Sequence, residues 1–279
     1  SNPRGDARRN DVSGKPGQKP GFFFGSQGAS IRGMENRFVV SQWAAFAPGL
    51  ESPAQWGEWA RAPWLPAGEG VPALAEMPAM QRRRLERLGR MALQVAWQVQ
   101  SEASDAVPLV FASRHGDITR THGMLQGLAR GEPLSPTHFG LSTHNAIVAQ
   151  YSIARGLGGN YLAVAAGVES AEAAVTEALG LLADGAPEVV VVQGDDRVPD
   201  EYAGYRDEPE APYAWAWRLR RARPGEAALS LSASGHGAAG PADSRLPHGL
   251  AVLRWFLGGG SALASPRSGR RWERHAAHA

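Results

Sequence analysis

The chain has 279 residues, of which 43% are hydrophobic, enough to bury one substantial core or two small ones. It contains no cysteine, which excludes disulfide bonds, thiolate metal sites and thiol nucleophiles. The net charge is +2, but the excess of Lys and Arg lies in residues 1–33 and 266–279, and the stretch between them is acidic overall. This distribution argues against nucleic-acid binding.

The N-terminal 33 residues lack a regular hydrophobic pattern and are expected to form a disordered extension. They carry positive charge without the apolar stretch of a secretory signal. No run of the sequence reaches the roughly 18 apolar residues that span a bilayer. We therefore expect a cytoplasmic protein without a membrane span.

Folded sequence is predicted to begin with a strand at residues 37–46, followed by a Pro- and Trp-rich connection at 48–78. Apolar residues at spacings of three and four then predict an amphipathic helix over residues 80–100. A buried strand at 108–113 follows. The next predicted elements are two helices, at 117–130 and 143–156.

The centre of the chain has the pattern of a βαβ unit, with a strand at 160–166, a helix at 169–184 and a strand at 188–194. Both strands are continuously apolar, as expected for parallel strands covered on two faces. The remaining predicted elements are antiparallel strands at 214–220 and 227–234, a helix at 247–258 and a basic tail from residue 266. This order predicts an α/β fold, a mostly parallel sheet flanked by helices, in one domain over residues 34–265.

Five short segments carry a family resemblance. They are Phe-Ala-Ser-Arg-His-Gly at 111–116, Leu-Ser-Pro-Thr at 134–137, Leu-Ser-Thr-His-Asn-Ala at 141–146, Ser-Ile-Ala-Arg-Gly at 152–156, and the segment around Gly167. Together they resemble the short chain-length factors, N-terminal-half relatives of β-ketoacyl synthases that are encoded with type II polyketide or aryl-polyene genes. The resemblance covers residues 34–205 well and implies a truncated thiolase-like (condensing-enzyme) fold.

Gly167 has a special place in this resemblance, because it occupies the position of the nucleophilic cysteine of condensing enzymes. There the N-terminus of the following helix lowers the pKa of the thiol. Glycine has nothing to attack with, and the half that carries the catalytic histidines is absent from this sequence. The resemblance therefore implies a subunit without catalysis, cofactor or metal. It pairs with a complete ketosynthase in a heterodimer and shapes the length of the acyl chain.

By the same resemblance, six residues are candidates for the heterodimer interface or the acyl tunnel: His144, Asn145, Tyr161, Ala163, Glu169 and Ser170. His144 and Asn145 open a predicted helix. A core histidine with satisfied hydrogen bonds and a helix cap explain these two residues equally well.

A polar group follows the predicted strand at 108–113, where open α/β sheets place their ligands. Ser113, Arg114, His115 and Asp117 are candidates for the polar lining of an acyl or carrier-protein channel. The simpler interpretation, which we favour, is a loop that ends with Asp117 as the N-cap of the next helix. Acidic residues 195 and 196 follow another strand without a third ligand, and they predict a turn rather than a metal site.

Arg82, Arg83, Arg84 and Arg87 gather at the start of the helix predicted at 80–100. The helix dipole disfavours positive charge there, which makes the cluster a candidate contact for an acidic acyl carrier protein. A solvated helix face is the ordinary alternative. A related hypothesis is a homodimeric scaffold that binds the carrier protein through residues 82–90.

A second class of function stays open, a free-standing serine-dependent acyltransferase or thioesterase. Ser170 would be the nucleophile, with His144 or His236 as its base. The sequence from Gly167 to Ala171 is not a Gly-x-Ser-x-Gly elbow. A position in the first turn of a helix therefore explains Ser170 better.

Overall fold

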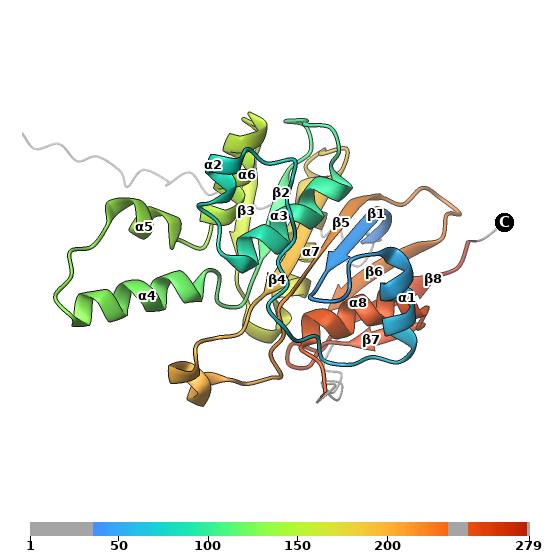
Figure 1. Ribbon diagram of the computed structural model, residues 1–279. Helices are drawn as coiled ribbons and strands as arrows, with labels where there is room; N and C mark the ends of the chain where they lie inside the picture. Colours follow the sequence, from blue (N-terminus) through green and yellow to red (C-terminus); the bar gives the residue numbers. More distant parts are fainter. Residues whose placement is uncertain (1–35, 234–244, 278–279) are drawn as a thin grey trace, which may run out of the picture. The chain divides into compact units, whose positions relative to one another are not determined.

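The computed structural model describes residues 36–233 and 245–277. The chain divides into residues 1–35 and a second unit that holds the whole described fold. The extension predicted at 1–33 and His236 therefore lie outside the described residues. The second unit is built on one eight-stranded sheet, in the order β3-β2-β4-β5-β1-β6-β8-β7 (Figure 1). Among the described residues, no helix is long and apolar enough to cross a membrane.

Parallel pairing is confined to three strands at one end of the sheet. β2 (Leu109–Ala112) lies between β3 (Tyr161–Val164) and β4 (Val189–Asp195) and is parallel to both. The remaining strands pair antiparallel: β5 (Tyr213–Arg221), β1 (Arg37–Phe46), β6 (Ala228–Ala233), β8 (Arg270–His275) and β7 (Ala262–Ala264). The α/β class is confirmed. The antiparallel strands predicted at 214–220 and 227–234 are confirmed as β5 and β6. The sheet is mixed rather than mostly parallel, because β1, β7 and β8 are antiparallel too.

Each face of the sheet packs against its own hydrophobic core, and successive side chains of β5 point alternately into one core and the other. Trp215 and Trp217 enter one core and stack with ring centroids 4.5 Å apart, whereas Ala214 and Ala216 enter the other. The tryptophan face carries α1 (Pro53–Arg61), α7 (Ser170–Ala183) and α8 (His248–Gly258). The alanine face carries α3 (Arg87–Val99) and α6 (Ala146–Arg155). The small side chains leave room for α3 to pack closely on the sheet.

Helix boundaries differ from the prediction where the arginines cluster. The helix predicted at 80–100 is split into a single turn, α2 (Ala79–Arg82), and α3, which begins at Arg87. α4 (Ile118–Ala129) begins directly after Asp117, whose carboxylate accepts a hydrogen bond from Arg120 N at 3.3 Å, as predicted for an N-cap.

Two short helices were not predicted, and each begins at a serine cap. α1 lies in the Pro- and Trp-rich connection, where Ser52 and Gln55 form a capping box. α5 (Pro136–Leu141) begins after Ser135, whose hydroxyl accepts a hydrogen bond from His138 N. Together α4 and α5 form an arm that projects from the sheet on the side of β3 (Figure 1).

The C-terminal segment is part of the fold, which corrects the expectation of a basic tail from residue 266. β8 pairs with β6 over six residues and with β7 over three, and Trp272 in β8 is fully buried. The composition of β8 explains the error. Arg270 and Arg274 share the face of Trp272, at either side of it, and Arg271 lies on the opposite face, so arginines dominate the segment while a single tryptophan is buried.

Candidate functional site

The strand-to-helix elbow predicted around Gly167 is present. β3 ends at Val164, a 3-10 turn spans Gly167–Glu169 and α7 begins at Ser170. Gly167 has φ +57°, in the left-handed region that glycine adopts without steric penalty. The Ser170 hydroxyl donates a hydrogen bond to Gly167 O at 2.8 Å and accepts one from Ala166 N at 3.0 Å. This hydroxyl therefore closes the turn of the elbow.

These contacts do not arrange Ser170 as a nucleophile. Its proton is directed at a backbone carbonyl, and the side chain is almost fully buried. Nε2 of His144 lies 3.1 Å from Val164 O, so this histidine also bonds to the backbone rather than to a hydroxyl. The geometry favours the structural interpretation of Ser170 over the serine-enzyme hypothesis.

Ion-paired arginines border the elbow. Arg114 contacts the carboxylates of Asp207 and, at 3.1 Å, Glu208, and Arg267 donates to the other oxygen of Asp207 at 2.8 Å. A Cβ atom built on Gly167 would lie 3.8 Å from Nη1 of Arg267. Burial raises the pKa of Asp207, but the two arginines outweigh burial, so that its pKa is lower than usual. Of this group the sequence singled out only Arg114 and the glycine.

Ser113 belongs to a buried network centred on Asp195, the last residue of β4. Oδ1 of Asp195 accepts hydrogen bonds from the Ser113 hydroxyl at 3.0 Å and from Arg114 N at 2.7 Å. Oδ2 accepts from Gln193 Nε2 at 3.0 Å and from the Tyr213 hydroxyl at 3.2 Å. Burial still raises the pKa of Asp195 to about 6. The strand runs one residue further than predicted, and an irregular connection over residues 196–199 takes the place of the predicted turn.

Glu208 is a second carboxyl group with a raised pKa beside this network. Its Oε2 accepts a hydrogen bond from His248 N at 2.8 Å. Burial raises the pKa of Glu208 to about 7, and the nearby charge of Asp195 adds to the effect. Sequence reasoning missed Glu208, because its loop has no motif and only the fold brings it to Arg114.

His115 and Asp117 complete the set expected to line a channel. His115 is largely exposed to solvent. The burial of part of its ring and the positive charge of Arg114 lower the pKa of His115. Asp117 is buried, caps α4 and pairs with Arg120 at 2.9 Å, and burial raises its pKa. The structure therefore gives Asp117 the helix-cap role that we favoured.

His144 is half-buried, and its ring contacts neighbouring residues of the chain. Its ring lies 5.8 Å from the ring of Phe111, and a Cβ on Gly116 would approach Nδ1 to 2.8 Å. Asn145 occupies the N-cap position of α6 but makes no side-chain capping bond, and it is exposed. The hydrogen bond to Val164 O favours the structural interpretation of His144, while Asn145 forms no side-chain cap.

Tyr161 and Ala163 lie on β3, the edge strand of the sheet, and both are half-buried against the core under α3 and α6. Glu169 follows the elbow, and its Oε1 accepts hydrogen bonds from the backbone of Arg267 and Ser268. Tyr161 and Ala163 thus lie on a strand at the edge of the sheet, whereas the carboxylate of Glu169 already forms hydrogen bonds within this chain.

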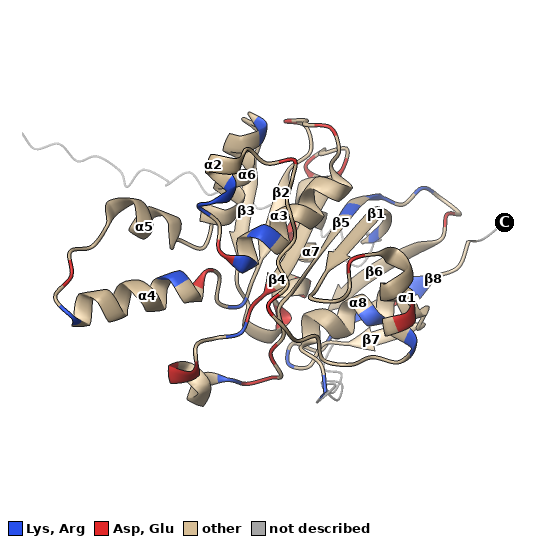
Figure 2. Ribbon diagram, viewed as in Figure 1, with Lys and Arg blue, Asp and Glu red and all other residues tan. Residues whose placement is uncertain are grey.

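The arginine cluster also divides. Arg82 donates to Leu74 O at 2.9 Å, and Arg87 donates to both oxygens of Asp196 and to Glu69. In the described part of the chain Arg83 and Arg84 have no carboxylate partner, and both are exposed. Lys and Arg positions are concentrated where α2 meets α3 (Figure 2).

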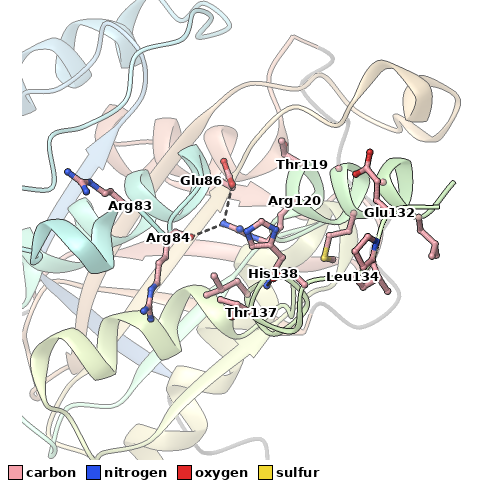
Figure 3. Close-up of a pocket in the computed structure, with 16 residues that line it drawn as sticks. Arg83, Arg84, Glu86, Thr119, Arg120, Glu132, Leu134, Thr137 and His138 are labelled. Carbon is pink, nitrogen blue, oxygen red and sulfur yellow. Dashed lines mark hydrogen bonds and ion pairs between the residues drawn. The ribbon is translucent and has the colours of Figure 1, made fainter. Parts of the chain in front are cut away.

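Arg83 and Arg84 border a cleft of about 490 Å³ between the α2–α3 junction and the arm formed by α4 and α5. Glu86 and Arg84 O hold the guanidinium of Arg120 on one wall (Figure 3). Leu128 and Leu134 on the arm supply exposed apolar surface. Among the residues described here, no group of three or more acidic, His or Cys side chains is placed to hold a metal ion.

A family model described as "Beta-ketoacyl synthase, N-terminal domain" matches residues 56–274. The chain belongs to this family. The match includes β7 and β8, in agreement with their place in the sheet. The family assignment also confirms the resemblance drawn from the five sequence segments.

Solved structures confirm the thiolase-like ketosynthase fold. One match is a chain of the ketosynthase (ApeO) in complex with its chain length factor (ApeC) from Xenorhabdus doucetiae, with 25% identity and a TM-score of 0.72. It covers 85% of this chain and 98% of that one. The ishigamide ketosynthase/chain length factor matches at 16% identity and TM-score 0.56, over 71% of this chain and 67% of the other. No curated protein sequence matches.

Proposed function

We propose that this chain is a non-catalytic chain-length factor that pairs with a complete ketosynthase and shapes acyl-chain length. The observation that carries the proposal is the elbow, which keeps its strand-turn-helix form around a glycine in a chain without cysteine. The partner supplies the nucleophile and the decarboxylating histidines. We place the pair in the cytoplasm, in polyene or polyketide biosynthesis.

The similarity to a chain from a ketosynthase–chain length factor complex supports a heterodimer, because nearly the whole of that chain is matched. A partner surface at the β3 end is supported by the distribution of exposed apolar side chains. Six of the large hydrophobic residues exposed in the described structure lie on α4, α5, α6, β3 or their connections: Leu125, Leu128, Leu134, Phe139, Ile153 and Leu162. Exposed apolar patches of this kind mark interaction surfaces.

β3 itself favours the same end of the molecule. It pairs with β2 on one side, and no strand of the described residues pairs with its other edge. An unpaired strand edge offers backbone hydrogen-bonding groups to another chain. We therefore assign the partner ketosynthase to the edge formed by β3 and the arm.

An acyl carrier protein is a second proposed partner, at the cleft bordered by Arg83 and Arg84. Two exposed guanidinium groups beside exposed leucines suit an acidic amphipathic helix. The charge-reversal variant Arg83→Glu/Arg84→Glu is expected to weaken carrier-protein binding. Arg61→Glu, a reversal on an exposed arginine in α1, serves as the control.

Co-expression with a ketosynthase from the same genome tests the main proposal, with size-exclusion chromatography and light scattering as the readout. We expect a one-to-one heterodimer that condenses acyl chains, and no condensation or decarboxylation by this chain alone. Turnover by the purified chain that Ser170→Ala abolishes would establish the serine-enzyme alternative instead. A stable homodimer that ignores the ketosynthase would favour the scaffold hypothesis.

A further inference from the structure

The connection between β7 and β8 follows one face of α7. Residues 265–272, which we call the C-terminal strap, make hydrogen bonds to Glu169, the N-cap residue of α7, and to two positions within that helix. Oε1 of Glu169 accepts from Arg267 N at 2.7 Å and Ser268 N at 2.6 Å. Thr176, two turns further along, accepts from Arg270 Nη1 at 3.1 Å. These positions are seven residues apart and lie on one side of a helix.

The middle attachment is the deepest. Glu172 lies between the other two positions and is fully buried. Its Oε1 accepts hydrogen bonds from the Ser265 hydroxyl at 3.0 Å and from Trp272 Nε1 at 2.8 Å. Both ends of the strap are thus fixed to one carboxylate oxygen in the first turn of α7, which limits how far the residues between them can move.

The strap carries Arg267 to the elbow. Its guanidinium bonds to Asp207, which also holds Arg114, so the side chain is anchored at its far end. A side chain at position 167 would start 3.8 Å from Nη1 of this guanidinium. The space that a nucleophile at Gly167 would face is therefore bordered on one side by Arg267 of the strap, whose side chain is 60% exposed.

We propose that the strap closes the elbow from within the chain, so that restoring a cysteine at position 167 does not restore a site for an acyl thioester. Under the proposed function, this closure is a second reason, besides the missing thiol, why the chain does not catalyse condensation. The inference rests on the proposed function for its consequence in the heterodimer, where only the partner subunit carries the growing chain.

The absence of native cysteine makes a clean test possible, because Gly167→Cys introduces a single thiol. The rate at which its thiolate displaces iodide from iodoacetamide is measured across pH. The high-pH plateau reports access, and the midpoint reports the thiol pKa. Ser101→Cys, at an exposed position, is the control, and Gly167→Cys/Arg267→Ala removes the guanidinium. All three thiols are expected to react equally in urea.

In the native chain we expect the plateau rate of Gly167→Cys to be about tenfold or more below that of Ser101→Cys, as for a site that reacts only after local opening. Adding Arg267→Ala to Gly167→Cys should raise the plateau rate most of the way to that of Ser101→Cys. It should also raise the pH midpoint, and so the thiol pKa, because a neighbouring cation is lost. A plateau equal to that of Ser101→Cys overturns the proposal, as does protection that Arg267→Ala leaves unchanged.

A measurement on the unaltered chain covers the case in which Gly167→Cys does not fold. Hydrogen exchange at the amides of Arg267 and Ser268 should be slowed by their bonds to Glu169, and Glu169→Ala should release them. Exchange at the rate of a free peptide would show an open strap. Neither readout involves the ketosynthase, so failure here is distinct from failure to form the heterodimer.

Discussion

Nε1 of Trp272 donates a hydrogen bond of 2.8 Å to Oε1 of Glu172 and thereby joins the last strand of the sheet to the helix that follows the elbow. The same oxygen lies 2.6 Å from Nε2 of His248 in α8. One carboxylate thus connects three elements that are far apart in sequence. His248, Ser265 and Trp272 converge on Oε1 of this buried carboxylate and stabilise its charge, whereas its Oε2 has no hydrogen-bond partner in the described structure.

Glu172→Ala is expected to destabilise the protein by about 3–5 kcal/mol, since it leaves buried donors and a histidine without their acceptor. Urea unfolding measures the change in free energy. Glu177→Ala, on an exposed position of the same helix, is the control and should have little effect. Equal effects of the two substitutions would mean that the cluster around Glu172 contributes nothing specific.

Stability should also depend on pH through Glu208, whose pKa burial raises from 4.5 to about 7. The folded chain holds this proton more tightly than the unfolded chain. The free energy of unfolding therefore falls as pH rises from 4.5 to about 7, by at most about 1.4 kcal/mol per pH unit for one group. Asp195 acts in the same direction up to about pH 6.

His248 has the same sign, because its pKa is raised: burial lowers it, but bonding to Glu172 outweighs burial. Its stabilising charge is lost as pH rises through the folded pKa. Urea unfolding between pH 5 and 8 measures the combined slope, and Glu208→Gln should flatten it. Glu201→Gln, at an exposed position, should leave the slope unchanged. A slope that survives Glu208→Gln intact would assign the effect to the other groups.

Local patterns predicted most of the elements. The strand at 37–46 coincides with β1, and the βαβ pattern places β3, α7 and β4 within a few residues. Period-2 and period-3.6 hydrophobicity is a property of each segment, so it is readable before the chain folds. The elbow at Gly167 was located by the resemblance to condensing enzymes, and it falls at the junction between the strand pattern and the helix pattern.

Long-range partners could not be predicted in this way. Glu208 and Arg267 flank Arg114 and the elbow only because loops distant in sequence meet there. The basic composition around Trp272 concealed a buried strand, since five polar residues surround the one side chain that packs. The pairing directions predicted for β3, β4, β5 and β6 are confirmed, but the sheet is not mostly parallel, because β1 and the unpredicted strands β7 and β8 also pair antiparallel.

Gly116 should tolerate no side chain. Its φ is +59°, which costs a non-glycine residue about 1–2 kcal/mol, and a Cβ would lie 2.8 Å from Nδ1 of His144. Gly131→Ala has a comparable φ of +76° but open space around the Cβ, so it carries the backbone cost alone. Urea unfolding should show Gly116→Ala as the more damaging. Adding His144→Ala should remove the excess, and additive effects of the pair would refute the contact.

Phe139, 62% exposed on α5, provides the sharpest test of the partner surface. Phe139→Asp is expected to weaken the heterodimer by about tenfold or more, because an aromatic side chain near the centre of an interface contributes strongly to affinity. Trp64→Asp is the control, because Trp64 is 47% exposed and follows α1, which lies across the molecule from the arm (Figure 1). Circular dichroism checks that both variants fold. Unchanged binding by Phe139→Asp, or equal losses from the two variants, would move the interface away from the arm and leave the β3 edge to be tested alone.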